Sequence, residues 1–113
     1  MANHETQLHT RFRAVDDGAA RQITELLRAT AAAAATEQGH LRYDVFAVEG
    51  DPTTLYVLEA WDSVDNARRH ADLVLGDRGH DRVQPLLREQ LDTVTLIPIT
   101  SAAASSTRAG LAA

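Results

Sequence analysis

Few side chains in this sequence could carry out chemistry. They are five histidines, two tyrosines, one tryptophan and the carboxylates, in a chain of 113 residues without cysteine. Imidazole has an ordinary pKa of about 6.5, which suits it to general acid or base catalysis near neutral pH. The lack of cysteine excludes disulfides, thiolate metal sites and cysteine nucleophiles. All 11 basic residues are arginine, so Schiff-base and phosphate-loop lysines are excluded as well.

Charge and hydropathy exclude further classes of function. The formal net charge is −5 and the sequence contains no basic run, so nucleic acid is not expected as a partner. No apolar stretch approaches the ~20 residues that a membrane span needs. Residues 1–5 contain neither a basic nor an apolar targeting segment. We therefore expect a soluble, cytoplasmic protein without membrane contact.

Two histidines stand close to apolar helical stripes. His70 flanks the stripe formed by Val64, Ala67, Ala71 and Val74, and His80 lies near the stripe of the following segment. Such a ring either completes its hydrogen bonds inside the core or serves a binding or catalytic site. Both interpretations stay open at this point.

A mid-strand carboxylate and the single tryptophan are the other candidates. Glu59 lies between Val57 and Trp61 at alternate positions, and a carboxylate is not expected to be buried there without a partner. It either pairs with an arginine or lines a polar patch in a pocket. Trp61 either anchors the core or contributes to a site.

No metal or cofactor is expected. His70-Ala71-Asp72 has the H-x-D form of a metal triad, but side chains two apart on a helix diverge by about 200° and cannot bind one ion. The sequence contains none of the glycine-rich nucleotide, flavin or nicotinamide motifs, and no G-x-S-x-G nucleophile motif.

Hydrophobic periodicity predicts the elements that must position these residues. Polar and apolar residues alternate over 5–15, with Leu8, Thr10, Phe12 and Ala14 on one face of a strand. Helical spacing then starts at the capping residues 16–18 and is expected to end at Gly39. Further segments follow in order: strands 40–49 and 53–61 joined by a turn, a helix after Asp62-Ser63, a short helix with Pro85 in its first turn, and a strand 92–99.

This order, β-α-β-β-α-β, predicts an α+β, ferredoxin-like split βαβ fold with a four-stranded antiparallel sheet. The domain covers residues 1–99, and residues 100–113 form an Ala/Ser-rich C-terminal tail. Two main helices cover only one sheet face, yet neighbouring strand residues of both faces are apolar. These pairs are Val45 and Phe46, Val57 and Leu58, and Leu96 and Ile97. We therefore predict a homodimer packed sheet against sheet.

Several short motifs, in this order and spacing, resemble the antibiotic biosynthesis monooxygenase family. Its pattern has a Gly-x-x-x-Tyr strand, a hairpin, a strand ending in Glu-x-Trp, and a histidine nine residues after the tryptophan. In this chain the matching positions are Gly39, Tyr43, Glu59, Trp61 and His70. The resemblance covers about residues 6–99. It implies a dimeric α+β barrel of ferredoxin-like subunits, in agreement with the fold predicted from the strand and helix order.

The resemblance also implies an activity. Well-known members oxygenate aromatic polyketides such as anthrones, or quinols, with molecular oxygen and no metal or bound flavin. His70 and Trp61 are the expected catalytic residues. His70 is assigned as base or hydrogen-bond partner because the ordinary pKa of imidazole is about 6.5, and the resemblance assigns Trp61 to the positioning of oxygen and substrate. Tyr43, Glu59, Thr10 and Phe12 would line the substrate pocket, with His80 contributed by an adjoining loop.

Two positions depart from the family pattern. Members often carry a second histidine about five residues after the first, whereas here the next one, His80, follows after ten. The loop 76–79 is therefore enlarged and either forms a lid or makes His80 non-equivalent. Haem-degrading relatives have an asparagine where this chain has Thr10, so haem degradation is not expected although Trp61 and His70 match.

Three functions are consistent with these residues. The favoured one is a cofactor-independent monooxygenase for an aromatic polyketide, with an aromatic small molecule and oxygen as substrates. The second is an isomerase or cyclase on the same scaffold, which would use acid and base groups such as His9, His40 and Glu59 without oxygen. The third is a dimer that binds a small molecule without catalysis.

Overall fold

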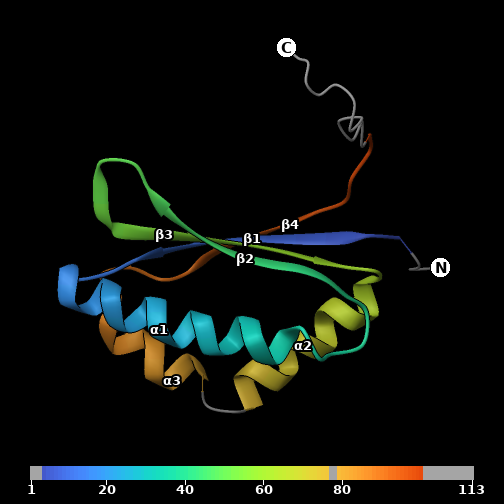
Figure 1. The fold of residues 1–113 in the computed structure, drawn as a ribbon, viewed down its shortest axis with the longest axis horizontal. Helices are drawn as coiled ribbons and strands as arrows, with labels where there is room; N and C mark the ends of the chain where they lie inside the picture. The colour runs from blue at the N-terminus through green and yellow to red at the C-terminus, as the bar shows by residue number, and fades with distance from the viewer. Residues whose placement is uncertain (1–3, 77–78, 101–113) are drawn as a thin grey trace.

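The computed structural model describes residues 4–76 and 79–100, without the side chains of residues 75–80 (Figure 1). Its elements are, in chain order, β1 (Thr6–Arg13), α1 (Asp17–Ala34), β2 (His40–Val48), β3 (Asp51–Trp61), α2 (Val64–Gly76), α3 (Gly79–Val83), the 3₁₀ turn η1 (Gln84–Leu86) and β4 (Asp92–Leu96). The predicted β-α-β-β-α-β order is confirmed.

The four strands form one sheet in the order β2-β3-β1-β4. Every neighbouring pair is antiparallel, with β1 between β3 and β4 and the β2–β3 hairpin at one edge. Among residues 4–76 and 79–100, the helices all lie on one side of this sheet and none lies on the opposite side (Figure 1). The predicted ferredoxin-like fold is therefore confirmed for the subunit.

Strand alternation places the core between the sheet and α1. Phe12 and Ala14 of β1 and its extension are buried on the helix face, as the period of two predicts. They pack with Leu55 and Val57 of β3, and α1 adds one buried stripe to the same cluster. The stripe consists of Ala19, Ala20, Ile23 and Leu27.

Side-chain caps fix the start of both main helices. An Oδ1 atom of Asp16 accepts a hydrogen bond from the backbone N–H of Ala19 at 2.8 Å. The Ser63 hydroxyl oxygen accepts one from the backbone N–H of Asn66 at 3.1 Å. Each cap satisfies a donor that the first helical turn leaves free, and the Ser63 cap sets the direction in which α2 presents its later residues.

The end of α1 differs from the prediction. The helix ends at Ala34 rather than at Gly39, because the chain tightens into turns in which Glu37 N–H donates to the carbonyl of Ala34. Gly39 lies just before β2 with a φ of +83°, a conformation that suits glycine. The intervening turns direct residue 37 back toward α2.

Three other boundaries also differ from the prediction. β3 begins at Asp51, inside the expected turn, because the hairpin turns tightly at Gly50 with a φ of +80°. Pro85 lies in η1 and not in the first turn of α3. β4 ends at Leu96, two residues before Pro98, where the missing N–H cannot continue the ladder.

Two predicted features lie outside the described residues. The first is the predicted tail, of which residues 101–113 are not described. The second is the expected lid loop, of which residues 77–78 are not described. Within the part of the chain that is described, no helix has the length and apolar character to cross a bilayer.

Gly39 should be the glycine at which a side chain is tolerated least. A Cβ atom there would lie 2.8 Å from the Cβ of Asn66 and would overlap the side chain of Asp62. We expect Gly39→Ala to lower the free energy of unfolding by about 3 kcal/mol, because steric overlap adds to the left-handed backbone penalty. Urea unfolding monitored by circular dichroism measures this change.

Gly50 provides the matched control. Its φ of +80° is nearly the same, but nothing lies within 4 Å of a Cβ built there. Gly50→Ala should therefore lower the free energy of unfolding only by the penalty for a left-handed backbone, about 1–2 kcal/mol. Equal losses for the two variants would contradict the close packing described for Gly39.

Candidate functional site

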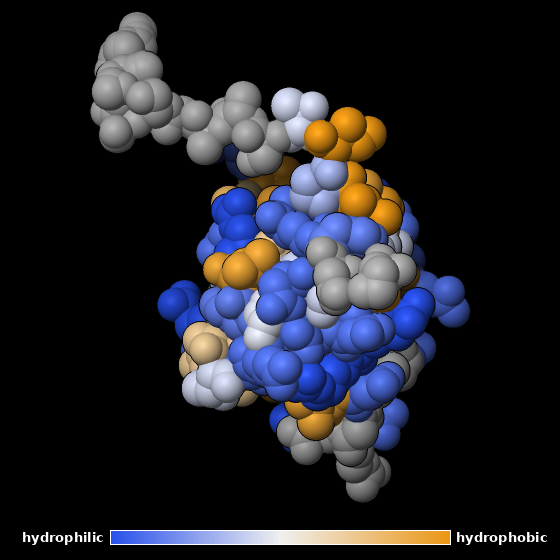
Figure 2. All heavy atoms as spheres, turned by 90° about the vertical axis from the view of Figure 1, so that its right-hand side faces the viewer, coloured by the Kyte–Doolittle hydropathy of each residue, from blue (hydrophilic) through white to orange (hydrophobic). Residues whose placement is uncertain are grey.

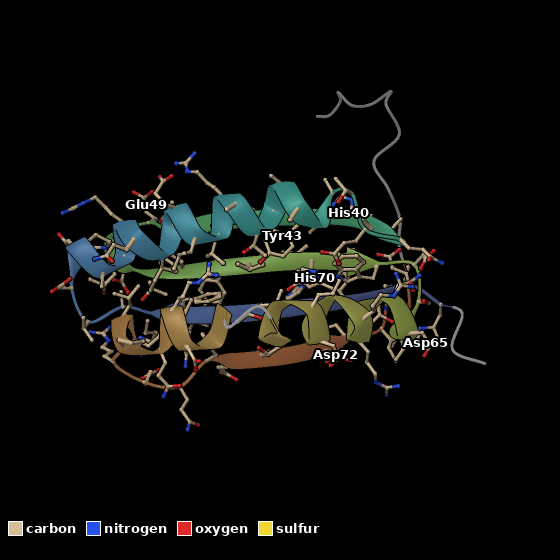
Figure 3. The ribbon with its side chains drawn as sticks, turned by 90° about the horizontal axis from the view of Figure 1, so that it is seen from below. His40, Tyr43, Glu49, Asp65, His70 and Asp72 are labelled. Carbon is tan, nitrogen blue, oxygen red and sulfur yellow. The ribbon has the colours of Figure 1, made fainter. Side chains whose placement is uncertain are left out.

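A cluster of aromatic and ionisable side chains gathers between the sheet and the helices near His70 (Figure 3). His70 comes from α2, Tyr43 from β2, and Glu59 and Trp61 from β3. The turn after α1 adds Glu37. The alternation of β3 places its two members on the same face, and the cap at the start of α2 turns His70 toward them.

The two ring nitrogens of His70 face different carboxylates. Its Nδ1 lies 3.0 and 3.2 Å from the two carboxylate oxygens of Glu37. Its Nε2 lies 3.7 Å from Oε1 of Glu59, too far for a hydrogen bond. An ionised carboxylate only accepts hydrogen bonds, so a neutral imidazole in this position would carry its proton on Nδ1 and leave Nε2 able to accept another.

Trp61 packs against one face of the His70 imidazole. The indole is fully buried and stacks on His70 with ring centres 4.8 Å apart and planes inclined by 29°. Its Nε1–H donates to Oε1 of Glu59 at 3.0 Å. Tyr43 meets the imidazole edge-on at a centroid distance of 5.7 Å. These contacts fix the ring plane of His70 and leave it little rotational freedom.

Burial changes the ionisation of Glu59. Desolvation raises the pKa of this carboxyl, opposed by the hydrogen bond from Trp61 and by the nearby His70, while Glu37 raises it further. Of the two interpretations that the sequence left open, arginine pairing is not what the structure shows. Within the described residues, the partners of Glu59 are Trp61 and His70.

Tyr43 stays protonated across the range in which proteins work. Burial, and then the charges of Glu59 and Glu37, raise the pKa of its phenol well above the ordinary value. A neutral phenol can donate a hydrogen bond to an oxygen atom of a ligand. Tyr43 is therefore suited to orient a bound molecule rather than to remove a proton from it.

A cavity of about 260 Å³ adjoins this cluster. Its polar lining comes from Thr10, Tyr43, Glu59 and His70, and Thr10 shares a hydrogen bond of 3.0 Å with Thr93. The remaining wall is mainly apolar. It includes Leu8, Phe12, Leu27, Val74 and Leu91. A concave apolar surface with a few convergent polar groups is typical of a small-molecule site.

The structure brings together most of the residues selected from the sequence. Thr10, Phe12, Tyr43, Glu59 and His70 all line the same cavity. Trp61 is fully buried behind His70 and holds it in place. The side chain of His80 lies outside the described residues, although its backbone belongs to α3.

Glu37 has no role among the sequence-based predictions. It is separated from His70 by 33 residues and lies in a turn, so no periodicity connects the two. The local sequence offers one weak indication of a role, namely that Glu37 stands two residues before the glycine that precedes β2. The fold alone makes it the hydrogen-bond partner of the imidazole.

The arrangement around His70 does not resemble a metal site. His70 is buried whereas Asp72 is exposed on the other side of α2 (Figure 3), as the divergence of neighbouring helical positions predicts. Among the residues that the structure describes, no three histidine or carboxylate side chains are grouped to hold an ion. The cluster is instead equipped for proton transfer, with one imidazole between two carboxylates.

Solved structures share this fold at low sequence identity. Rv0793 from Mycobacterium tuberculosis is 21% identical, with a TM-score of 0.78 over 88% of this chain and 99% of its own. PA3566 from Pseudomonas aeruginosa is 23% identical, with a TM-score of 0.76 over 88% and 99%. SnoaB from Streptomyces nogalater, a cofactor-independent oxygenase, is 15% identical, with a TM-score of 0.75 over 87% and 96%. At these identities the likeness shows the fold alone.

The family assignment comes from the sequence itself. No curated protein matches this chain, but the family model for antibiotic biosynthesis monooxygenase matches residues 7–74. That range runs from β1 into α2 and includes Glu37, Tyr43, Glu59, Trp61 and His70. The chain therefore belongs to the antibiotic biosynthesis monooxygenase family.

Proposed function

We propose that the protein is a cofactor-independent monooxygenase that oxidises an aromatic polyketide, of the anthrone or quinol type, in natural-product biosynthesis. One observation carries the proposal: a buried, oriented imidazole borders an apolar cavity. His70 is 4% exposed, bonded to Glu37 through Nδ1, and lines the cavity of about 260 Å³.

The reaction can be written with the groups present. Nε2 of His70 takes a proton from the anthrone methylene and leaves an electron-rich carbanion. The carbanion transfers one electron to molecular oxygen, and the radical pair combines to form a C–O bond. The resulting peroxide anion takes up a proton, and the hydroperoxide then loses water to give the ketone. One oxygen atom ends in the product and the other in water, and the substrate supplies all the electrons.

The cavity wall supports these steps. Tyr43 and Thr10 can hydrogen-bond to substrate oxygens, and Phe12 and the leucines of the wall can pack against the flat ring system. Burial raises the pKa of Glu59, and in its protonated form this carboxyl can donate a hydrogen bond to a substrate carbonyl. An apolar wall also keeps water from the radical pair and the peroxide.

An isomerase or cyclase is the second candidate. The observation that favours it is the carboxylate–imidazole–carboxylate arrangement of Glu37, His70 and Glu59, which could move protons within a substrate without oxygen. Equal turnover in the absence of oxygen would select this candidate. The non-catalytic alternative is less well supported, because the interior is hollow and His70 is not turned to solvent.

The open sheet face supports a homodimer. Large apolar side chains are exposed there, with Phe46 of β2 paired to Tyr56 of β3 and Val94 and Leu96 on β4. Figure 2 shows apolar atoms gathered at the top of the molecule, the side of the sheet without helices, above a mainly hydrophilic surface. A second copy would bury this face.

Replacement of His70 tests the proposed base. His70→Ala should lower turnover by about 10²-fold or more, since no other imidazole among the described residues lines the cavity. His70→Gln, which keeps a hydrogen-bonding side chain without a basic nitrogen, should behave in the same way. Oxygen uptake after addition of an anthrone or quinol to metal-stripped protein provides the measurement, with the thermal midpoint as a check on folding.

His4→Ala is the matched control, because His4 is exposed and its ring bonds to the carbonyl of the neighbouring Glu5, away from the cavity lining. It should leave oxygen uptake unchanged. Normal turnover in both His70 variants would remove the imidazole from the mechanism.

The raised pKa of Glu59 should appear in the pH dependence of stability. The folded state holds this proton to higher pH than the unfolded chain, whose ordinary value is 4.5. The contribution of Glu59 is therefore complete below that value and is lost as the pH rises through the folded-state pKa. Glu59→Gln cannot ionise and should remove this decline in unfolding free energy.

Urea unfolding from about pH 4 to about pH 8 measures the effect in both proteins. Glu25→Gln serves as control because Glu25 is exposed on α1. Parallel stability curves for the parent and Glu59→Gln would show that burial of Glu59 does not perturb its ionisation.

Substitution on the open sheet face tests the dimer. Phe46→Glu places a charge where the partner sheet would pack, and it should shift the protein to the mass of a monomer in light scattering at micromolar concentration. Val15→Glu introduces the same charge at an apolar residue of similar exposure, 50% against 45%, in the turn between β1 and α1. A dimer that persists in Phe46→Glu, or is lost equally in both variants, would contradict the proposed interface.

A further inference from the structure

We propose that Glu37 is a proton carrier that connects His70 to a second cavity, through which the active site exchanges its proton with water. This inference rests on the proposed role of His70 as a base. It adds a route for the proton and a residue that does not line the substrate cavity.

The second cavity lies between α1 and α2 and measures about 210 Å³. Leu26, Ala29 and Ala33 of α1 and Leu73 of α2 form its apolar sides, and Arg82 and Glu37 are its charged members. Small alanine side chains on α1 leave this space open.

His70 forms part of the wall between the two cavities. Together with Thr30 and Val74 it lines both of them. Glu59 lines only the substrate cavity and Glu37 only the second one. Because Nε2 faces Glu59 and Nδ1 is bonded to Glu37, each ring nitrogen serves a different cavity.

Of the imidazole and the two carboxylates beside it, Glu37 has the side chain most exposed to solvent. The side chain of His70 is 5% exposed, that of Glu59 10% and that of Glu37 17%. Glu37 is thus the member of the group that water reaches most readily. A proton that leaves the imidazole through Nδ1 arrives at the carboxylate best placed to release it.

The transfer balances in protons and charge. When Nε2 accepts a proton from the substrate, Nδ1 gives its own proton to a carboxylate oxygen of Glu37. The imidazole remains neutral in the other tautomer, Glu37 becomes a carboxylic acid, and no electrons move. Glu37 then releases the proton to water, and the reverse sequence restores the first tautomer when the peroxide anion is protonated. The imidazole carries no net charge at any stage of this transfer.

The groups around His70 are consistent with proton transfer from its Nδ1 toward Glu37. Tyr43 from β2 meets the ring edge-on, and Trp61 from β3 covers one face. Glu59 from β3 is the only other carboxyl among the described residues within ion-pair distance of the ring. From α3, Arg82 lines the second cavity together with Glu37.

Two substitutions of Glu37 separate proton transfer from mere positioning. Glu37→Gln keeps a carbonyl oxygen that accepts from Nδ1–H but cannot take up the proton, whereas Glu37→Ala removes both functions. We expect both to lower kcat by about 10²-fold, with KM changed less than threefold. If Gln retained nearly full activity and only Ala lost it, Glu37 would be a positioning residue and the proposal would be wrong.

A second measurement does not depend on turnover. Nitrogen-15 NMR of the histidine ring reports which nitrogen carries the proton and how fast that proton exchanges with water. In the parent and in Glu37→Gln the proton should reside on Nδ1, but its exchange should be at least about tenfold slower in the variant. Unchanged exchange, or a proton on Nε2 in the parent, would overturn the proposal even if the substrate remained unknown.

Glu25→Gln is the matched control. It removes a carboxylate of α1 that is 73% exposed and paired with Arg28, and it should alter neither kcat nor exchange. If oxygen uptake fails in the parent while exchange responds to Glu37→Gln, the proposed oxygenase activity is wrong and the proton route still holds.

Discussion

The structure depends on how a buried imidazole completes its interactions. His70 is almost inaccessible to water, and a polar ring in such a place destabilises the fold unless hydrogen bonds replace those to water. Glu37 supplies one of them, and Trp61 supplies a stacked face. Trp61 also donates to Glu59, so one indole orients both the imidazole and the second carboxyl. The contacts that stabilise the buried imidazole therefore also orient the groups of the candidate site.

That arrangement depends on the connection between α1 and β2, which supplies Glu37. α1 ends at Ala34, and the turns that follow bring Glu37 under α2. Gly39 is needed there because a Cβ would overlap Asn66 and Asp62. The carbonyl of Gly39 in turn accepts from Asp62 N–H at 2.9 Å. The connection between α1 and β2 is thus tied to the start of α2, and any loosening of it would move Glu37 away from Nδ1.

The two faces of the sheet differ in what covers them. The helix face combines a packed cluster around Ile23 and Val57 with a hollow region beside His70. The other face presents exposed apolar residues such as Phe46 and Tyr56, and no helix of the described residues covers it. A cavity weakens the core of a small domain, and burial of the open face against a second copy would offset that loss.

The sequence by itself determined the order of elements, the two faces of the first strand and the candidates His70, Trp61, Glu59, Tyr43 and Thr10. It could do so because periodicity, capping and turn residues are local signals. Tertiary structure decided which nitrogen of the imidazole is bonded, that Glu59 pairs with indole and imidazole rather than arginine, and that Glu37 belongs to the site. The contacts of His70 with Glu37 and Glu59 join separate elements of the chain, and only the packing of α2 against the sheet brings these side chains close together. The cavities, likewise, are volumes that several elements leave between them, which no single segment encodes.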